Sequence, residues 1–390
     1  MGTPRPYSPL LFFLLLTVSA CSEQPTTLPT VGVIVASEGP ADYIGRPEQQ
    51  VLEALEKEYS LAPSTPMPFR LRIVNSAGDP ARAASLYRDF AADTTVLAVI
   101  GPSTSGEAIA VSSLADELKL PVLALAASKK IVVDTTDHVR PWMFKFAQND
   151  DLAAAALLTA LTADGKTTVG LLYSDDGFGK SGAEQFKRAA SQLGAVRVLY
   201  VSAYDPKLTT AEPVVRGLPP ALDAVVIWGT APGPTEIIHA LRKRGPTSIY
   251  LSHGNASQDF LANLGADAEG LVVIGSRVLL EQSALNPALP ADKVISDYQL
   301  FWGKRDFRGP PSHFGGHARD GFQALMQVFS KPGIHTRAAV RDGLENLGTY
   351  YGVTGTFRFS PTDHAGLDAS AFATFRISNG RFVPRDMPNK

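Results

Sequence analysis

Residues 96–128 (VLAVIGPSTSGEAIAVSSLADELKLPVLALAAS) constrain the fold more than any other stretch of this chain. They begin with a short apolar run, typical of a parallel strand covered on both faces. A Gly-Pro break and three hydroxyl residues follow, and then a helical pattern and a second apolar run. Thr104 and Glu107 have the spacing of a capping box, which predicts that the helix begins here. The order strand, helix, strand predicts a crossover between neighbouring parallel strands.

Small polar residues follow the carboxyl ends of both predicted strands. Thr104 and Ser105 come after the first strand, and Ala126 and Ser128 come after the second. The carboxyl ends of parallel strands meet at one edge of a sheet, where open α/β folds bind their ligands. Free backbone N–H groups at a helix N-terminus favour an anion such as a carboxylate. This stretch therefore predicts one wall of a small-molecule site.

Strand and helix signals alternate along the rest of the chain in two runs, joined near residues 144–148. The first run starts with an apolar strand at residues 30–36 and a helix from Pro47 to about Tyr59. The second starts after Asn149 with an alanine-rich helix. Such alternation predicts parallel sheets with helices on both faces. The expected fold class is α/β, with two doubly wound lobes.

The composition excludes several classes of partner. The net charge is −2 and no block of Lys or Arg occurs, so we expect no nucleic acid partner and no adhesion to an anionic membrane surface. Hydrophobic residues make up 45% of the 390 residues, enough for sizeable globular cores.

The N-terminal segment has the pattern of an export signal. Residues 1–20 carry Arg5, an apolar run too short to span a bilayer as a permanent helix, and small residues at the end. Cys21 is the single cysteine, and Val-Ser-Ala-Cys resembles the bacterial lipobox. This resemblance implies cleavage before Cys21, a lipid on its sulfur, and a lipidated tether at residues 21–29. The alternative is an ordinary secretory signal that leaves Cys21 as a free thiol.

Catalytic, phosphate-binding and metal-binding patterns are weak. In GPSTSG, Ser105 stands where a serine nucleophile elbow needs its second glycine, and the chain has no phosphate-binding loop of the Walker type. His313 and His317 could share one helix face, but no third ligand is close in sequence. We expect a protein that is not an enzyme, with no catalytic residues, no cofactor and no metal.

Two aromatic residues, Tyr43 and Phe178, are predicted in loops at strand ends, one in each lobe. They either cover the lobe edges or close on a small ligand from opposite sides, with apolar area and one polar group.

The order of several segments resembles the type I periplasmic binding proteins, specifically the branched-chain amino-acid (leucine/isoleucine/valine) receptors of ABC transporters. The match spans about residues 30–385, and no single motif in it is stringent. The segments are VGVIVASEGPADYIG, VLAVIGPSTSGEAIA, LKLPVLALAAS, LLYSDDGFGKSGAEQFK, LGADAEGLVV and YGVTGTFRFSPTDHAGL.

The resemblance implies two lobes with a ligand cleft between them, joined by a three-crossover hinge that closes on ligand. Lobe 1 would comprise residues 30–146 and 276–351, and lobe 2 residues 147–275 and 352–385. The crossovers would lie near residues 144–148, 275–277 and 350–354.

The resemblance also implies roles in ligand binding. The ligand carboxylate would contact the hydroxyls of Ser105 and Ser128 and main-chain groups of Thr104 and Ala126. Further residues expected to line the cleft are Tyr43, Phe178 and Thr230.

The chain departs from the family at the usual ammonium-binding acid. The loop after Leu251 reads Ser-His-Gly-Asn and places His253 in the cleft, with no carboxylate. Asp175 or Asp176 could supply the missing charge. The ligand is therefore expected to be an amino acid or a related small polar metabolite.

The expected function is that of an exported, monomeric, lipid-anchored receptor on the periplasmic or cell-surface side of a bacterial membrane. It would deliver its small-molecule ligand to an ABC permease. The alternative is a lipoprotein sensor or regulator that uses the same fold to bind a protein partner such as an envelope enzyme.

Overall fold

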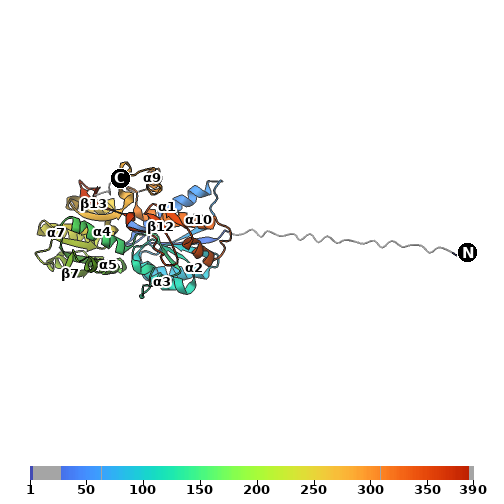
Figure 1. The fold of residues 1–390 in the computed structure, drawn as a ribbon, viewed down its shortest axis with the longest axis horizontal. Coiled ribbons are helices and arrows are strands. Elements are labelled where there is room, and N and C mark those ends of the chain that lie inside the picture. The colour runs from blue at the N-terminus through green and yellow to red at the C-terminus, as the bar shows by residue number, and fades with distance from the viewer. Residues whose placement is uncertain (3–27, 63, 308, 386–390) are drawn as a thin grey trace.

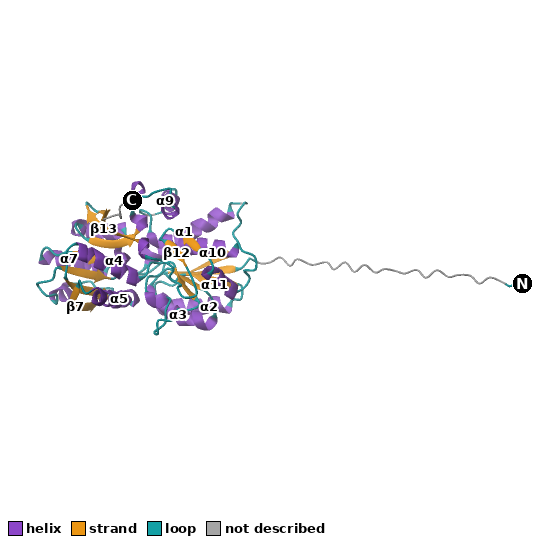
Figure 2. Ribbon diagram, viewed as in Figure 1, coloured by secondary structure: helices purple, strands orange, loops and turns teal. Residues whose placement is uncertain are grey.

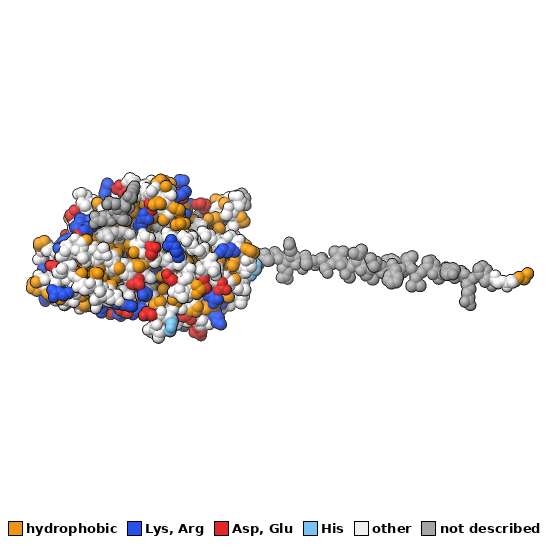
Figure 3. Space-filling model, in the orientation of Figure 1, with side chains coloured by type: hydrophobic (Ala, Val, Ile, Leu, Met, Phe, Trp, Pro, Cys, Tyr) orange, Lys and Arg blue, Asp and Glu red, His pale blue; other side chains and the backbone are white. Residues whose placement is uncertain are grey.

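The structure of the protein, a computed structural model, describes residues 1–2, 28–62, 64–307 and 309–385. Cys21, nearly all of the predicted export signal and most of the predicted tether lie outside the described residues, so these expectations stay predictions. Across the ranges described, no helix is both long and apolar enough to cross a membrane. Figure 3 shows acidic and basic side chains interspersed over the visible face, in keeping with the small net charge.

Lobe 1 is built on a parallel sheet. Its strands are β1 (Thr30–Val35), β2 (Arg70–Asn75), β3 (Val96–Ile100), β4 (Val122–Ala124) and β5 (Met143–Lys145). Their order across the sheet is β2-β1-β3-β4-β5, and every pair is parallel. The predicted capping box is present, because the Thr104 hydroxyl and the Glu107 carboxylate each accept from the other residue's backbone N–H.

Helices cover both faces of this sheet, as the alternation predicted (Figure 2). One face carries α1 (Asp42–Ser60), α10 (His313–Phe329) and α11 (Arg337–Glu345), and the other carries α2 (Pro80–Ala92) and α3 (Ser105–Leu118). Successive residues of a strand point to opposite faces. Accordingly, Val33 belongs to the core beneath α1 and α10, and its neighbour Ile34 to the core beneath α2 and α3.

Lobe 2 is built on a larger, mixed sheet. Its strands are β6 (Thr168–Ser174), β7 (Arg197–Tyr204), β8 (Ala224–Trp228), β9 (Ile249–Leu251), β10 (Val272–Ser276), β13 (Phe372–Ser378) and β14 (Arg381–Arg385). Their order is β14-β13-β10-β9-β8-β6-β7. The strands from β6 to β10 pair in parallel, and β13 and β14 add an antiparallel edge.

Helices also cover both faces of the second sheet. One core includes residues of α4 (Asp150–Ala163) and α5 (Gly177–Leu193). The other includes residues of α6 (Glu212–Arg216), α7 (Gly233–Arg244) and α8 (Gln258–Leu264). Figure 1 shows the two lobes side by side. Helix α9 (Pro290–Gly303) contributes Trp302 to the lobe 1 core and packs Ile295 in a small cluster with Phe375 of β13. The predicted α/β class with two doubly wound lobes is confirmed.

The last crossover lies later than predicted. Residues 349–358 form a hairpin of β11 (Thr349–Tyr351) and β12 (Thr356–Arg358). Phe357 packs against Phe146 and Tyr350, with ring centroids 5.0 and 5.7 Å apart. The lobe 1 core continues to Ala371, and the chain joins the lobe 2 sheet at β13. The expected start of the second lobe 2 segment at residue 352 is therefore too early, because this hairpin packs on lobe 1.

Two helices begin earlier than predicted. Helix α1 starts at Asp42, one turn before Pro47, which lies inside the helix. Helix α5 starts at Gly177, directly after its N-cap Asp176. Tyr43 and Phe178 therefore lie in the first turns of helices and not in loops.

Candidate functional site

A cavity of about 400 Å³ lies between the lobes, at the carboxyl ends of the strands. This volume is in the range of small-molecule sites. Lobe 1 contributes the first turn of α1, the β3–α3 and β4 loops and the start of α10, and lobe 2 contributes the loops after β6, β8 and β9. The residues predicted from the sequence that line it are Tyr43, Thr104, Ser105, Ala126, Asp176, Phe178, Thr230 and His253.

The N-terminus of α3 gives the cavity wall an anion-binding character. The Thr104 hydroxyl donates to the Glu107 carboxylate at 2.6 Å, so the capping box already engages that side chain. The Ser105 hydroxyl accepts from the Ser128 N–H at 3.2 Å and keeps its own proton for another acceptor. The N–H groups of the first helical residues, Ser105 and Gly106, have no intrahelical partner. A carboxylate can bind here.

Ser128 does not line the cavity. It is fully buried, and its hydroxyl donates to the Ser181 hydroxyl of lobe 2 at 2.7 Å. Ser181 in turn donates to the Asp150 carboxylate. The structure therefore assigns the Ser128 hydroxyl to a contact between the lobes, and its expected contact with a ligand carboxylate is not what the geometry shows.

The structure separates the two candidate acids. Asp176 lines the cavity, and its Oδ1 accepts from the Gly179 N–H at 2.8 Å as the N-cap of α5. Asp175 is not part of the wall, and its carboxylate pairs with Lys180 at 2.8 Å. Among the described residues that line the cavity, Asp176 is the only acidic one. Of the two acids considered from the sequence, Asp176 is therefore the one whose side chain is available to the cavity.

Tyr43 of lobe 1 and Thr230 of lobe 2 both line the cavity. Burial raises the pKa of the Tyr43 phenol, and the nearby Thr230 side chain opposes this rise. The phenol is neutral at pH 7 and offers one donor and one acceptor. Its ring also meets the edge of Phe314 at a centroid distance of 6.2 Å.

Three buried histidines line the same cavity. His253 was predicted, whereas His313 and His317 of α10 were considered only as a metal-binding pair. Burial lowers the pKa of His253 to about 3 and that of His313 to about 4, and it also lowers the pKa of His317. All three are neutral at pH 7. No group of three or more His, Cys, Asp or Glu side chains in the described part of the chain is arranged to hold a metal ion.

Aromatic side chains surround His253. The ring of Phe178 meets it edge-on at 5.3 Å, and Trp228 and Phe372 lie at 6.2 and 5.4 Å between centroids. Phe178 therefore lines the cleft and also fixes the position of a second wall residue.

The two lobes are in contact around the cavity, so the structure is a closed form. A Cβ atom on Gly177 of α5 would lie 2.9 Å from the backbone nitrogen of Gly106 in α3. Beside this contact, Lys130 pairs with Glu184 at 2.6 Å. The close approach requires a residue without a side chain at position 177.

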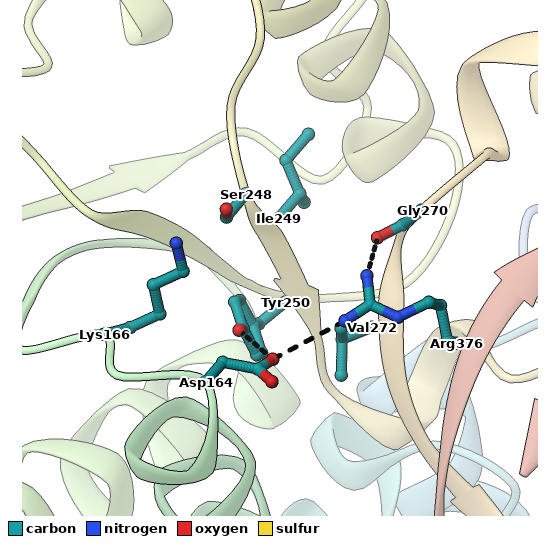
Figure 4. Close-up of a pocket in the computed structure, with 8 residues that line it drawn as sticks. All are labelled: Asp164, Lys166, Ser248, Ile249, Tyr250, Gly270, Val272 and Arg376. Atoms are coloured by element: carbon teal, nitrogen blue, oxygen red, sulfur yellow. Dashed lines mark hydrogen bonds and ion pairs between the residues drawn. The ribbon is translucent and has the colours of Figure 1, made fainter. Parts of the chain in front are cut away.

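A second pocket, of about 270 Å³, lies on lobe 2 at the end of the sheet away from the cleft (Figure 4). Its acidic group, Asp164, is already paired with Arg376 and accepts from the Tyr250 hydroxyl at 2.5 Å. This pocket contains none of the residues predicted for the site.

Comparison with protein families and solved structures agrees with this geometry. A family model described as "Periplasmic binding protein" matches residues 29–381. An extracellular ligand-binding receptor from Rhodopseudomonas palustris HaA2 has a TM-score of 0.82 and 25% identity, covering 92% of this chain and 99% of that chain. A leucine binding protein from Thermotoga maritima has the same fold, with a TM-score of 0.78, 16% identity, and coverage of 92% and 98%.

Two curated relatives are similar to this chain and are longer proteins. Glutamate receptor 2.1 of Arabidopsis thaliana is 22% identical over 386 residues, which are 96% of this chain and 41% of that protein. The chemotactic signal transduction system substrate-binding protein BasB of Halobacterium salinarum is 28% identical over 171 residues, 43% of this chain and 41% of that protein. The chain spans about two fifths of the length of both relatives.

Proposed function

This chain belongs to the periplasmic binding protein family, and on that premise we propose that it is an extracytoplasmic solute-binding receptor of an ABC transporter. Its ligand is an amino acid or a related small polar metabolite, held between the lobes. The observation that carries this proposal is a cavity between the lobes with one polar group on each lobe: the α3 N-terminus on lobe 1, which favours an anion, and Asp176 on lobe 2, which favours a cation.

These two polar groups match the carboxylate and the ammonium of an α-amino acid. The ligand carboxylate accepts from the Ser105 hydroxyl and from free N–H groups at the start of α3. The ligand ammonium donates to the Asp176 carboxylate and to the Tyr43 phenol oxygen. Each of these is a charge-assisted hydrogen bond, which is stronger than a bond between neutral groups.

Binding is coupled to closure of the lobes. The carboxylate-binding groups at the start of α3 lie on lobe 1, and Asp176 lies on lobe 2. A ligand that bridges them therefore binds the closed form more tightly and shifts the population toward it. The permease would then recognise the closed, loaded receptor. Export, lipidation of Cys21 and a monomeric state complete the proposal and rest on the sequence pattern.

A thermal-shift screen of residues 23–390 against amino acids, small carboxylates and amides tests the proposal. A ligand at one hundred times its Kd should stabilise the protein by about 2.7 kcal/mol. Binding of one or more of these compounds supports the receptor. No binding anywhere in a broad metabolite panel would reject it.

A sensory role is the second candidate. It is favoured by the similarity to a binding protein named for chemotactic signal transduction. In this role the closed receptor would contact a membrane sensor or an envelope enzyme and not a permease. Affinity capture from solubilised membranes distinguishes the two, because the identity of the captured membrane partner differs.

A further inference from the structure

One face of helix α5 carries contacts between the lobes. Gly177, Ser181 and Glu184 are spaced at i, i+4 and i+7, so they lie on the same side of the helix. The first two make the approach to α3 and the hydroxyl contact described above. Glu184 pairs with Lys130 of lobe 1, with 2.6 Å between the Glu184 Oε2 and the Lys130 Nζ. This row of residues therefore ends in an ion pair between the lobes.

The charges at this place are divided by lobe. Lys129 and Lys130 lie in the short 3-10 helix η1 (Lys129–Ile131), which follows β4 in lobe 1. Their partners, Asp151 of α4 and Glu184 of α5, belong to lobe 2. The Lys129 Nζ lies 3.2 Å from the Asp151 Oδ2, so both pairs have the cation on lobe 1 and the anion on lobe 2. Opposite charges therefore face each other across the closed lobes.

The backbone that carries the two lysines is held in place. Ile131 is fully buried in the lobe 1 core. The Lys130 N–H donates to the Ser128 hydroxyl at 3.2 Å, and the Lys129 N–H donates to the buried Asp150 carboxylate at 3.1 Å. The lysine side chains therefore start from fixed positions beside lobe 2.

Other charged groups lie close to these pairs. Three cations of α5 are three or four residues from Glu184: Lys180, Lys187 and Arg188. They belong to the same helix as Glu184, so their attraction is the same in the open and the closed form. The buried Lys145 of β5 attracts Asp151 from lobe 1, in the same sense as Lys129 does.

The two ion pairs lie outside the ligand site. None of their four side chains is among the described residues that line the cavity. They therefore act on the equilibrium between the open and closed forms and not on the ligand directly.

We propose that the pairs Lys129–Asp151 and Lys130–Glu184 form an electrostatic latch that stabilises the closed form, so that ligand affinity falls as ionic strength rises. The inference rests on the proposed function and adds a regulation of the same site. Dissolved ions screen the attraction, because the Debye length falls from about 30 Å at 0.01 M salt to about 3 Å at 1 M. The four side chains are between 27% and 55% exposed, so we expect each pair to change the affinity by about two- to fivefold.

Isothermal titration of charge-reversal variants tests the latch. The probe is leucine, or the tightest binder among the other amino acids where leucine does not bind. Lys130→Glu places like charges opposite each other and should raise the Kd about fivefold in dilute salt. The exchange of Lys130→Glu together with Glu184→Lys restores opposite charges and should bring the Kd back to within about twofold of wild type. The matched control Lys293→Glu reverses a pair of similar length and exposure inside α9, 2.7 Å from Asp297, and should leave the Kd unchanged.

The salt dependence of binding is the second measurement. Between about 0.01 M and about 1 M NaCl, the Kd of the wild type should rise about threefold more than that of the double variant Lys129→Gln and Lys130→Gln, which lacks both pairs. Both proteins keep the same cavity wall, so the effect of salt on the ligand's own contacts cancels in the comparison.

Equal Kd values for Lys130→Glu and Lys293→Glu would overturn the latch and leave the receptor role intact. An exchange variant that binds no better than Lys130→Glu would do the same, and so would an equal salt dependence of the wild type and the double variant. No binding of any compound in the wider screen would overturn the proposed function and the inference together.

Discussion

Asp175 and Asp176 are neighbours in the sequence, yet only Asp176 lines the cavity. The difference arises because Asp176 is the N-cap of α5 and turns toward the cleft, whereas Asp175 pairs with Lys180 outside it. Their roles can therefore be separated by the same chemical change at adjacent positions.

Asp176→Asn should lower the affinity for an α-amino ligand by about ten- to one-hundred-fold, since hydrogen bonds to charged groups contribute about 1.5–3 kcal/mol. Asparagine caps a helix about as well as aspartate, so the stability of α5 should be kept. Isothermal titration measures the effect. Asp175→Asn is the control and should stay within about threefold of wild type; equal losses in both variants would contradict the assignment.

The buried histidines predict how stability depends on pH. Folding lowers the pKa of His253 from 6.5 to about 3, so as the pH falls the unfolded chain binds the proton first. Stability is therefore full above about pH 6.5 and is lost below it, by up to about 1.4 kcal/mol per pH unit for each such histidine. His253→Phe should show a smaller loss between pH 7 and 5 in urea unfolding.

Asp320 has the opposite effect on stability. Burial raises its pKa to about 6, so the folded protein binds this proton before the unfolded chain does and becomes more stable as the pH falls. This contribution is common to wild type and variant, so it cancels in their difference. An identical pH profile for both proteins would refute the role given to His253.

The wall residues that were predicted from the sequence could be found because they follow strand ends that are visible in it. His313 and His317 were missed as wall residues since α10 is far along the chain and reaches the cleft only by packing on α1. Two histidines four residues apart at a helix start were the available signal. The placement of Ser128 was not predictable, because its partner Ser181 lies on the other lobe.

At the scale of elements, the long strands could be predicted from continuous apolar runs, whereas short elements could not be predicted. The strand β5 is only three residues long and carries no pattern of its own. The start of α1 was missed because Pro47 resembled a first-turn proline. In the structure Pro47 lies inside the helix, five residues after its start at Asp42. The last crossover was expected too early because the hairpin of β11 and β12 belongs to lobe 1 only through its packing, which the sequence does not reveal.

The capping box at α3 was predictable from two residues and yields a direct test. Thr104→Ala removes the hydroxyl that accepts from the Glu107 N–H and should lower the free energy of unfolding by about 1 kcal/mol in urea. Thr104→Ser keeps the hydroxyl and should lose at most a few tenths of that value. A similar loss in both variants would assign the effect to the methyl group.

At the scale of the whole molecule, closure depends on the contact between the N-termini of α3 and α5. Gly177→Ala places a Cβ 2.9 Å from the Gly106 nitrogen, which the closed form cannot accept without moving the lobes apart. We expect ligand affinity to fall about tenfold or more while the melting temperature without ligand stays close to wild type, because alanine is favourable in a helix.

Isothermal titration and small-angle X-ray scattering with saturating ligand check this prediction. The control Gly303→Ala makes the same change at the end of α9, where no atom lies within 4 Å of the added Cβ. Unchanged affinity and unchanged compaction in Gly177→Ala would show that the lobes do not approach so closely in solution.

The hydroxyl chain from Ser128 through Ser181 to Asp150 joins the lobes, and none of its three side chains lines the cavity. Contacts of this kind change the equilibrium between open and closed forms for every ligand by the same factor. Their removal would shift the concentration range over which the receptor responds and leave its order of preference among ligands unchanged. Sensitivity and selectivity are thus carried by different residues, so evolution or an engineer could adjust one of them independently of the other.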